Sequence, residues 1–234
     1  MIRSIGSGIS DLLYPPRCAV CRQLGLPSYC DDCLKQIIYI EQPFCTCCGL
    51  PGQSKLCREC LAGNRAFTSA RGVGYYRATL ATALKTFKYN ASLSLVEPLG
   101  KLMTDFLDTE IGQDVAGVEM VMPVPIHLSR HKKRGFNQAR LLAEPVAKHL
   151  GLPLSDALLL RTKRTLPQVD LTPEQRRENV SDAFEVRMPS EIKGRRILLV
   201  DDIMTTGSTV TSCSKTLLSA GASSIYVLAL ARET

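Results

Sequence analysis

Two adjacent carboxylates, Asp201 and Asp202, follow a short apolar run and precede a turn rich in hydroxyl groups. The run 197–200 predicts a buried strand, and the segment 208–220 predicts a helix that Gly221 ends. The turn between them places backbone N–H groups at a helix N-terminus, where a phosphate binds favourably. Carboxylates beside such a turn suit a sugar phosphate, because they accept hydrogen bonds from hydroxyls while the turn holds the phosphate.

The complete segment 197–209, ILLVDDIMTTGST, resembles the signature with which type I phosphoribosyltransferases bind phosphoribosyl pyrophosphate (PRPP). The resemblance implies that Asp201 and Asp202 bind the ribose hydroxyls. It also implies that the 5-phosphate is held by Thr205, Thr206, Gly207, Ser208 and Thr209. An ordinary polar turn between a strand and a helix is the alternative, but the full run favours the sugar-phosphate site.

Eight of the ten cysteines repeat one spacing, a CxxC followed after eight residues by a second CxxC. The two copies are Cys18, Cys21, Cys30 and Cys33, and then Cys45, Cys48, Cys57 and Cys60. Four thiolates suit tetrahedral Zn²⁺, so the pattern predicts two structural zinc sites. Sequential ribbons and a cross-brace that shares ligands between the copies both fit the spacing. A disulfide framework fits less well, because nothing in the sequence points to an oxidising compartment.

The remaining two cysteines fall outside the repeat. Cys47 is out of register with it, and Cys213 lies in the helix expected after the hydroxyl-rich turn. We expect neither to bind metal.

A chain of 234 residues can hold one α/β domain and a small accessory module. We expect an N-terminal helix and double zinc ribbon at residues 1–64, followed by the α/β domain at residues 65–234. No run approaches the 18 apolar residues of a membrane span. The polar start, broken by Pro15 and Pro16, does not fit a secretory signal. We therefore expect a cytoplasmic protein.

The net charge of +7 comes from the segment 127–196. Its densest part is the cationic loop expected after a strand at 119–125, which contains Arg130, Lys133 and Arg134. Ligands of open α/β sheets bind outside the carboxyl ends of the strands. We therefore expect this loop to face the pyrophosphate of PRPP, with a solvated charge run as the alternative.

Other elements follow from hydrophobic spacing. Two helices are expected within 79–107, and Lys88 near the end of the first is expected to face solvent. Asn137 predicts the start of another helix and Gly151 its end. The apolar run 225–231 predicts a final buried strand.

The polar, basic segment 161–179 predicts either a lid or an unstructured stretch. We favour a lid, because type I phosphoribosyltransferases place a mobile catalytic loop at this point. Lys163 and Arg164 would then act with Arg134 on the departing pyrophosphate. With Asp201 and Asp202, these three cations form the expected catalytic set.

With the run RGFNQA at 134–139 and the segment 165–184 added to these motifs, the whole chain resembles the ComF family of competence proteins. The resemblance implies an α/β fold, a type I phosphoribosyltransferase-like parallel sheet flanked by helices, behind a small double zinc ribbon. It further implies a role in natural DNA uptake, with a DNA-translocating helicase or ATPase of the uptake machinery as partner.

Two functions remain open at this point. The first is transfer of a phosphoribosyl group from PRPP, bound with Mg²⁺, to an unknown acceptor. The second is non-catalytic binding of single-stranded DNA or a protein partner. The sequence names no acceptor pocket and no general base, since His127, His131 and His149 are scattered. The absence of GxxxxGK[ST] and GxGxxG argues against P-loop and dinucleotide-binding folds.

Overall fold

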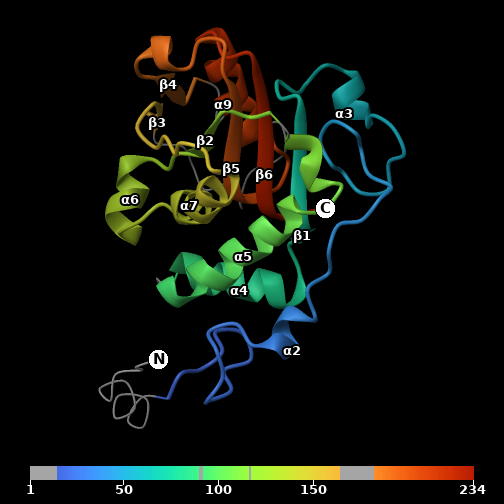
Figure 1. Cartoon of the computed structure of the whole chain (residues 1–234), viewed down its shortest axis with the longest axis vertical. Helices are drawn as coiled ribbons and strands as arrows, with labels where there is room; N and C mark the ends of the chain where they lie inside the picture. The colour runs from blue at the N-terminus through green and yellow to red at the C-terminus, as the bar shows by residue number, and fades with distance from the viewer. Residues whose placement is uncertain (1–14, 90–91, 116, 164–181) are drawn as a thin grey trace.

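The computed structural model describes residues 15–89, 92–115, 117–163 and 182–234, and Figure 1 shows the whole chain. Its centre is a four-stranded, fully parallel sheet in the order β1-β6-β5-β2. The strands are β1 (Ser69–Tyr75), β2 (Met120–Pro123), β5 (Arg196–Met204) and β6 (Ser224–Arg232). The expected class, a parallel sheet flanked by helices, is confirmed. The expected N-terminal helix and most of the expected lid lie outside the described residues.

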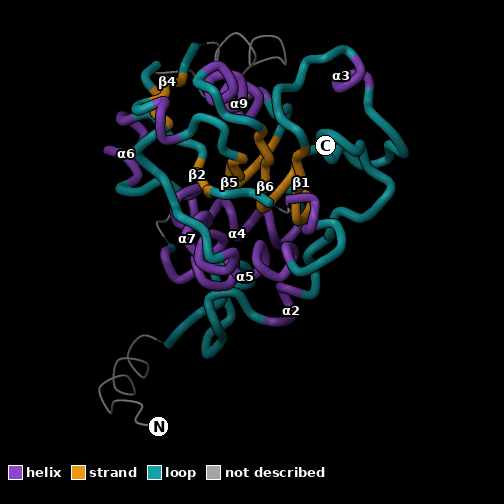
Figure 2. Tube along the Cα trace, turned by 45° about the horizontal axis from the view of Figure 1, so that its top comes forward, coloured by secondary structure: helices purple, strands orange, loops and turns teal. Residues whose placement is uncertain are grey.

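Helices cover both faces of the sheet (Figure 2). One face carries α4 (Ala78–Tyr89), α5 (Val96–Leu107) and α7 (Gln138–Leu150). The other carries α9 (Ser208–Ser219) and a hairpin of β3 (Leu159–Arg161) and β4 (Phe184–Val186). Shorter helices are α2 (Asp31–Leu34), α3 (Arg58–Leu61), α6 (Leu128–Arg134), η1 (Leu93–Leu95), η2 (Gly112–Val115) and η4 (Pro189–Glu191). Within the described ranges, none of the helices has both the length and the apolar character that crossing a bilayer requires.

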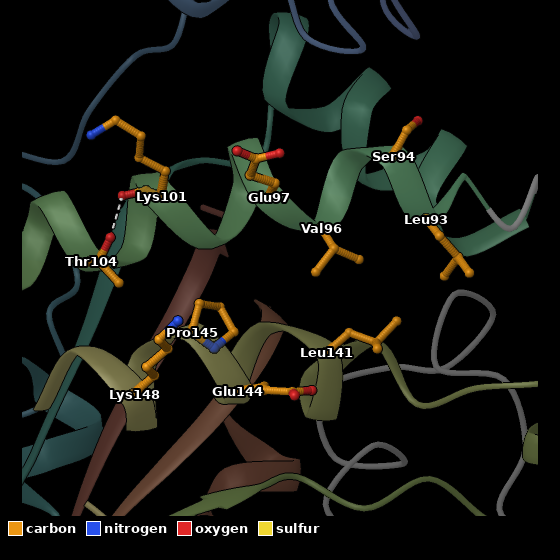
Figure 3. A pocket seen from close by; sticks show the side chains of 10 residues that line it. All are labelled: Leu93, Ser94, Val96, Glu97, Lys101, Thr104, Leu141, Glu144, Pro145 and Lys148. Atoms are coloured by element: carbon orange, nitrogen blue, oxygen red, sulfur yellow. Dashed lines mark hydrogen bonds between the residues drawn. The ribbon is translucent and has the colours of Figure 1, made fainter. Parts of the chain in front are cut away.

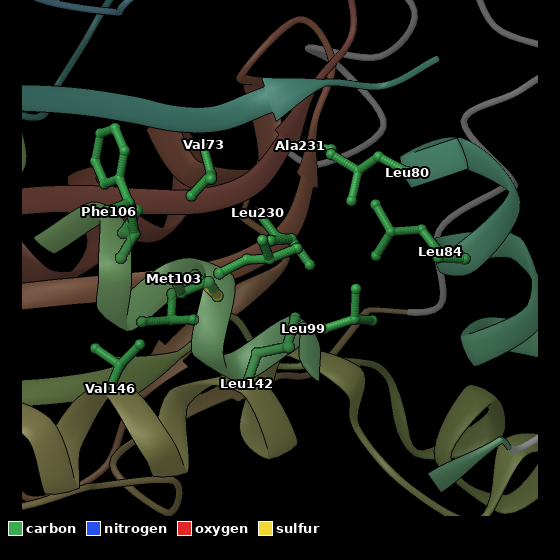
Figure 4. Close-up of a cluster of buried hydrophobic side chains, with 14 of the residues drawn as sticks. Val73, Leu80, Leu84, Leu99, Met103, Phe106, Leu142, Val146, Leu230 and Ala231 are labelled. Carbon is green, nitrogen blue, oxygen red and sulfur yellow. The ribbon is translucent and has the colours of Figure 1, made fainter. Parts of the chain in front are cut away.

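The central strands are apolar on both faces because both faces are covered. In β5, Leu198 and Val200 belong to the core beneath α4, α5 and α7, whereas Ile197 and Leu199 belong to the core beneath α9. Figure 4 shows the first of these cores, to which β6 contributes Leu230. Each such fully buried side chain contributes about 1.5–3 kcal/mol of transfer free energy. The two cores together hold β5 and its carboxyl end in place.

Helix α7 begins and ends where the sequence predicts. The side chain of Asn137 accepts a hydrogen bond from the backbone N–H of Ala139 at 3.1 Å, and Gly151 ends the helix with a φ of 65°. Pro145 lies inside α7 and packs closely on α5, because a Cβ on Gly100 would stand 2.6 Å from Pro145 Cγ. The glycine therefore permits the contact between the two helices.

Two sequence expectations are wrong in detail. The cationic loop is a short helix, α6, which begins after His127 and ends at Gly135. The Nδ1 atom of His127 accepts from the backbone N–H of Ser129 at 3.1 Å, and Gly135 has a φ of 82°. Strand β5 is longer than its apolar run and carries Asp201 and Asp202 within it, because its ladder with β6 continues beyond them.

Residues 38–49 run along the outer edge of β1. Tyr75 N–H donates to Ile38 O at 2.9 Å, and Ala70 N–H donates to Cys47 O at 2.7 Å. The cysteine-rich N-terminal part thus pairs with an edge that would otherwise present free backbone groups. In Figure 1, α3 stands beside β1 and α2 stands below α4.

Candidate functional site

The hydroxyl turn, residues 205–209, joins β5 to α9 at the carboxyl edge of the sheet. Gly207 adopts a φ of 75°, which lets the chain reverse and start the helix at Ser208. Thr206 Oγ1 lies 2.7 Å from Ser208 Oγ and accepts from Ser208 N–H at 3.3 Å. Thr205 and Thr209 are half-buried in the same turn. Hydroxyl and N–H groups at the start of a 12-residue helix form a suitable anion site.

The two carboxylates lie side by side just before this turn. Asp201 Oδ1 accepts from the backbone N–H of Asp202 at 2.9 Å. Burial, and then the charge of Asp202, raise the pKa of Asp201 to about 8. Both acids lie within β5, and Ile203 and Met204 separate them from the hydroxyl turn.

Lys88 is a site residue that the sequence interpretation missed. Its Nζ lies 2.8 Å from Asp202 Oδ2, and its side chain is 18% exposed, so the expected solvent-facing position is wrong. Burial acts to lower the pKa of Lys88, but the Asp202 carboxylate outweighs this effect and the pKa is raised. The signal that could have found it is its i,i+4 spacing from the buried Leu84 on α4.

The cations of α6 divide into inward and outward groups. The guanidinium of Arg134 lies 5.7 Å from the ring centre of Tyr89 and donates to Gln138 Oε1 at 3.3 Å. Burial, and then the charge of Arg134, lower the pKa of Arg130. Lys133 is exposed. The structure thus brings Arg130 and Arg134 together and leaves Lys133 at the surface.

The beginning of the expected lid is only partly visible. Lys163 is exposed and lies 4.0 Å from Asp182 Oδ2, while Arg164 lies outside the described residues. A second missed residue, Arg161, ends β3 and stacks on Phe184 at 5.4 Å. Burial, and then the charge of Arg130, lower the pKa of Arg161, whereas the Asp201 carboxylate acts to raise it. Arg161 is therefore a buried cation whose described contact is the ring of Phe184.

The cysteines form two compact groups, each built from one copy of the repeat. The first cysteine cluster is Cys18, Cys21, Cys30 and Cys33, and the second cysteine cluster is Cys45, Cys48, Cys57 and Cys60. Sulfur separations are 3.9 Å for Cys18–Cys33, 3.8 Å for Cys21–Cys30, 3.7 Å for Cys45–Cys60 and 3.6 Å for Cys48–Cys57. Tetrahedral Zn²⁺ with a Zn–S bond of 2.3 Å needs a separation of about 3.8 Å. The clusters fit structural zinc in the sequential arrangement, and the cross-brace is wrong.

Backbone N–H groups donate hydrogen bonds to one sulfur in each cluster. Val20 N–H donates to Cys18 Sγ at 3.4 Å, and Cys57 N–H donates to Cys45 Sγ at 3.3 Å. Burial acts to raise the pKa of Cys18 and Cys45, but such backbone bonds outweigh it and lower the pKa of each to about 6. The thiolate, which is the form that binds metal, is favoured at these two residues. Burial instead raises the pKa of Cys33 to about 12 and that of Cys48 to about 11. Neither Cys47 nor Cys213 joins a cluster.

A separate groove of about 630 Å³ lies between α5 and α7 (Figure 3). Apolar side chains, Val96, Leu141 and Pro145, face into it, while Glu97 and Lys148 lie along its rim. None of its lining residues belongs to the hydroxyl turn or to a cysteine cluster. Its position between α5 and α7 sets this groove apart from the carboxylate site.

Two family models match two separate parts of the chain. Residues 9–61 match the double zinc ribbon domain, and residues 137–233 match the phosphoribosyl transferase domain. The first match contains both cysteine clusters. The second contains the hydroxyl turn and the two carboxylates.

Known proteins resemble the chain over most of its length. Competence protein F of Haemophilus influenzae is 31% identical over 223 residues, which cover 92% of this chain and 96% of that protein. DNA utilization protein YhgH of Escherichia coli strain K12 is 30% identical over 229 residues, covering 94% and 99%. Hypoxanthine phosphoribosyltransferase of Staphylococcus aureus, 16% identical, superposes with a TM-score of 0.37 over 58% of this chain and 64% of that one. The chain belongs to the Competence protein F (ComF) family.

Proposed function

We propose that residues 65–234 bind PRPP and that residues 1–64 are a structural zinc module. The observation that carries this proposal is the hydroxyl turn, which lies at the start of α9 and is separated from Asp202 by two residues. The turn supplies backbone and hydroxyl donors for the 5-phosphate. The carboxylates supply acceptors for the ribose hydroxyls.

The cations have complementary roles in this proposal. Lys88 holds Asp202 through its 2.8 Å ion pair and so orients the acceptor toward the sugar. Arg130 and Arg134 face the pyrophosphate, whose charge their guanidinium groups offset. Lys163 and Arg164 would add positive charge for the departing pyrophosphate. Mg²⁺, which binds through phosphate oxygens, would neutralise further charge on the diphosphate.

A transfer reaction follows from this arrangement. The bond between the ribose C1 and the pyrophosphate oxygen breaks, the pyrophosphate leaves with the electron pair, and an acceptor nucleophile forms the new bond to C1. Fixed cations stabilise the charge that develops on the leaving group, which is the main catalytic contribution that this site offers. Binding of PRPP without turnover is the alternative, as a sensor that acts on DNA or a protein partner.

The relatives named for competence and DNA utilization support a role in DNA uptake. In this proposal the protein works in the cytoplasm beside the helicase or ATPase that draws single-stranded DNA into the cell. The exposed lysines of α6 would face that DNA, because phosphate backbones attract such cations.

Calorimetric titration of PRPP with Mg²⁺ tests the binding site. We expect the double variant Asp201→Asn plus Asp202→Asn to bind at least tenfold more weakly than wild type, since a hydrogen bond to the ion-paired Asp202 carboxylate alone contributes about 1.5–3 kcal/mol. Asp105→Asn, which changes an exposed carboxylate on α5, is the matched control and should bind normally. Equal affinity in all three proteins, or no binding by wild type, contradicts the proposal. Pyrophosphate release with candidate acceptors separates transfer from binding.

A further inference from the structure

A buried arginine joins the second cysteine cluster to the strand end that carries the hydroxyl turn. Arg232, the last residue of β6, is 3% exposed. Its Nη1 donates to Cys48 O at 2.7 Å, and its Nη2 lies 3.9 Å from Cys48 Sγ. The same Nη1 lies 3.7 Å from Sδ of Met204, the last residue of β5. One guanidinium therefore touches both the metal-ligand group and the residue immediately before the turn.

The charge of a filled cluster suits this contact. Four thiolates and one Zn²⁺ carry a net charge of −2. A buried guanidinium is stable only when an opposite charge or several acceptors accompany it. Cys48 supplies both to Arg232. Its carbonyl oxygen accepts a hydrogen bond, and its sulfur belongs to the negatively charged cluster. The position of Arg232, and with it the packing on Met204, thus depends on the cluster.

A second arginine, Arg65, lies just after the second cysteine cluster in sequence and contacts the hydroxyl turn and the start of α9. Its Nη1 lies 3.5 Å from Thr211 Oγ1 in the first turn of α9. The same atom stands 3.1 Å from the place that a Cβ on Gly207 would occupy. The missing side chain of Gly207 is what allows this close approach. Arg65 therefore supports the turn at its tightest residue.

The first cysteine cluster has a different environment. It packs against α4, where Thr86 Oγ1 donates to Ala19 O at 3.5 Å. The two clusters have the same ligand spacing but different neighbours, so they form a natural pair for comparison.

We propose that the second cysteine cluster positions the hydroxyl turn through Arg232 and Arg65, so that metal loading of this cluster controls the affinity of the turn for a sugar phosphate. The affinity part rests on the function proposed above, whereas the positioning part concerns the backbone of the turn alone. Arg232 and Arg65 are positioning residues in this arrangement. The zinc module is then a support for the phosphate site as well as a folded unit.

Matched cysteine variants test the proposal. Cys60→Ser removes a ligand from the second cluster, and Cys21→Ser removes one from the first; both side chains are at least partly exposed. We expect each variant to lose about one zinc per chain. Hydrogen exchange of a peptide covering 203–212 should accelerate at least tenfold in Cys60→Ser and stay unchanged in Cys21→Ser. Ribose 5-phosphate should bind at least tenfold more weakly to Cys60→Ser only.

A third variant separates positioning from folding of the ribbon. Arg232→Lys keeps the charge but cannot reach the carbonyl, the sulfur and Met204 together. We expect it to retain zinc, to exchange normally across α7 and to exchange faster at 203–212. Turn exchange at the wild-type rate in both Cys60→Ser and Arg232→Lys overturns the proposal. If wild type fails to bind ribose 5-phosphate, the proposed function fails while the exchange rates still decide the positioning claim.

Discussion

At the scale of single residues, Asp201 is a carboxyl group whose pKa the fold raises strongly. Burial, and then the neighbouring Asp202, raise its pKa to about 8 from an ordinary value of 3.8. In the unfolded chain the carboxyl loses its proton near pH 4, but in the folded chain it keeps the proton up to about pH 8. Between these values the folded state binds more protons, so the contribution of Asp201 to stability is lost as the pH rises.

Asp201→Asn should remove this dependence. We expect the melting temperature of the variant, relative to wild type, to rise steadily from pH 4 to pH 8, because the amide has no proton to lose. Thermal unfolding followed by circular dichroism at several pH values measures the difference. A melting-temperature difference that is constant with pH would show that Asp201 is not perturbed.

Residues in a local motif can be identified from the sequence, whereas residues placed by tertiary packing cannot. The sequence singles out Asp201, Asp202 and the hydroxyl turn as candidate site residues because their signal is local and dense. Lys88 and Arg161 were missed because each acts through a partner far away in the chain, and a lone basic residue at the end of an element is more often solvated. Only the packing of α4 on the sheet brings Lys88 to Asp202, and only the pairing of β3 with β4 places Arg161 on Phe184.

At the scale of elements, helices with regular apolar spacing were predicted well, whereas elements without such spacing were not. Helices α4, α5 and α7 have regular apolar spacing, and α7 has a side-chain cap as well. Helix α6 has seven mostly charged residues and therefore no periodic signal. The end of β5 was misplaced because its acids interrupt the apolar run, whereas its backbone ladder with β6 continues to Met204.

Gly207→Ala tests whether the conformation of the hydroxyl turn between β5 and α9 requires a glycine. A left-handed backbone costs an alanine about 1–2 kcal/mol, and the new Cβ would also stand 3.1 Å from Arg65 Nη1. We expect urea unfolding to show a stability loss of about that size, together with weaker binding of ribose 5-phosphate. Gly151→Ala, with a φ of 65° and open space around it, should lose similar stability and bind normally. Equal affinity of both variants for ribose 5-phosphate would argue against a role of the hydroxyl turn in phosphate binding.

At the scale of the whole molecule, the zinc module and the α/β domain differ in what holds them together. The module is too small to bury a large core of its own, so metal must supply most of its stability. The repeat predicted both clusters from spacing alone. It could not predict their grouping, since a cross-brace has the same spacing, nor the contact of Cys48 with Arg232 across 184 positions of sequence.

Removal of zinc should therefore unfold one part selectively. Structural zinc sites contribute about 10–16 kcal/mol of binding free energy, which the ribbons lose on chelation. We expect residues 18–60 to become sensitive to protease while a fragment beginning near residue 65 survives, and part of the circular dichroism signal to disappear. Restoring zinc should reverse both changes. A chelated protein with unchanged spectrum and protease pattern would show that the ribbons fold without metal.

The pairing of residues 38–49 with β1 has one more consequence. When the ribbon is lost, the N–H of Ala70 and of Tyr75 lose their partners, and the sheet gains an open side. An open strand edge is a template on which a second chain can add its own strand. We therefore expect the zinc-free protein to self-associate more strongly than the zinc-loaded protein as its concentration rises.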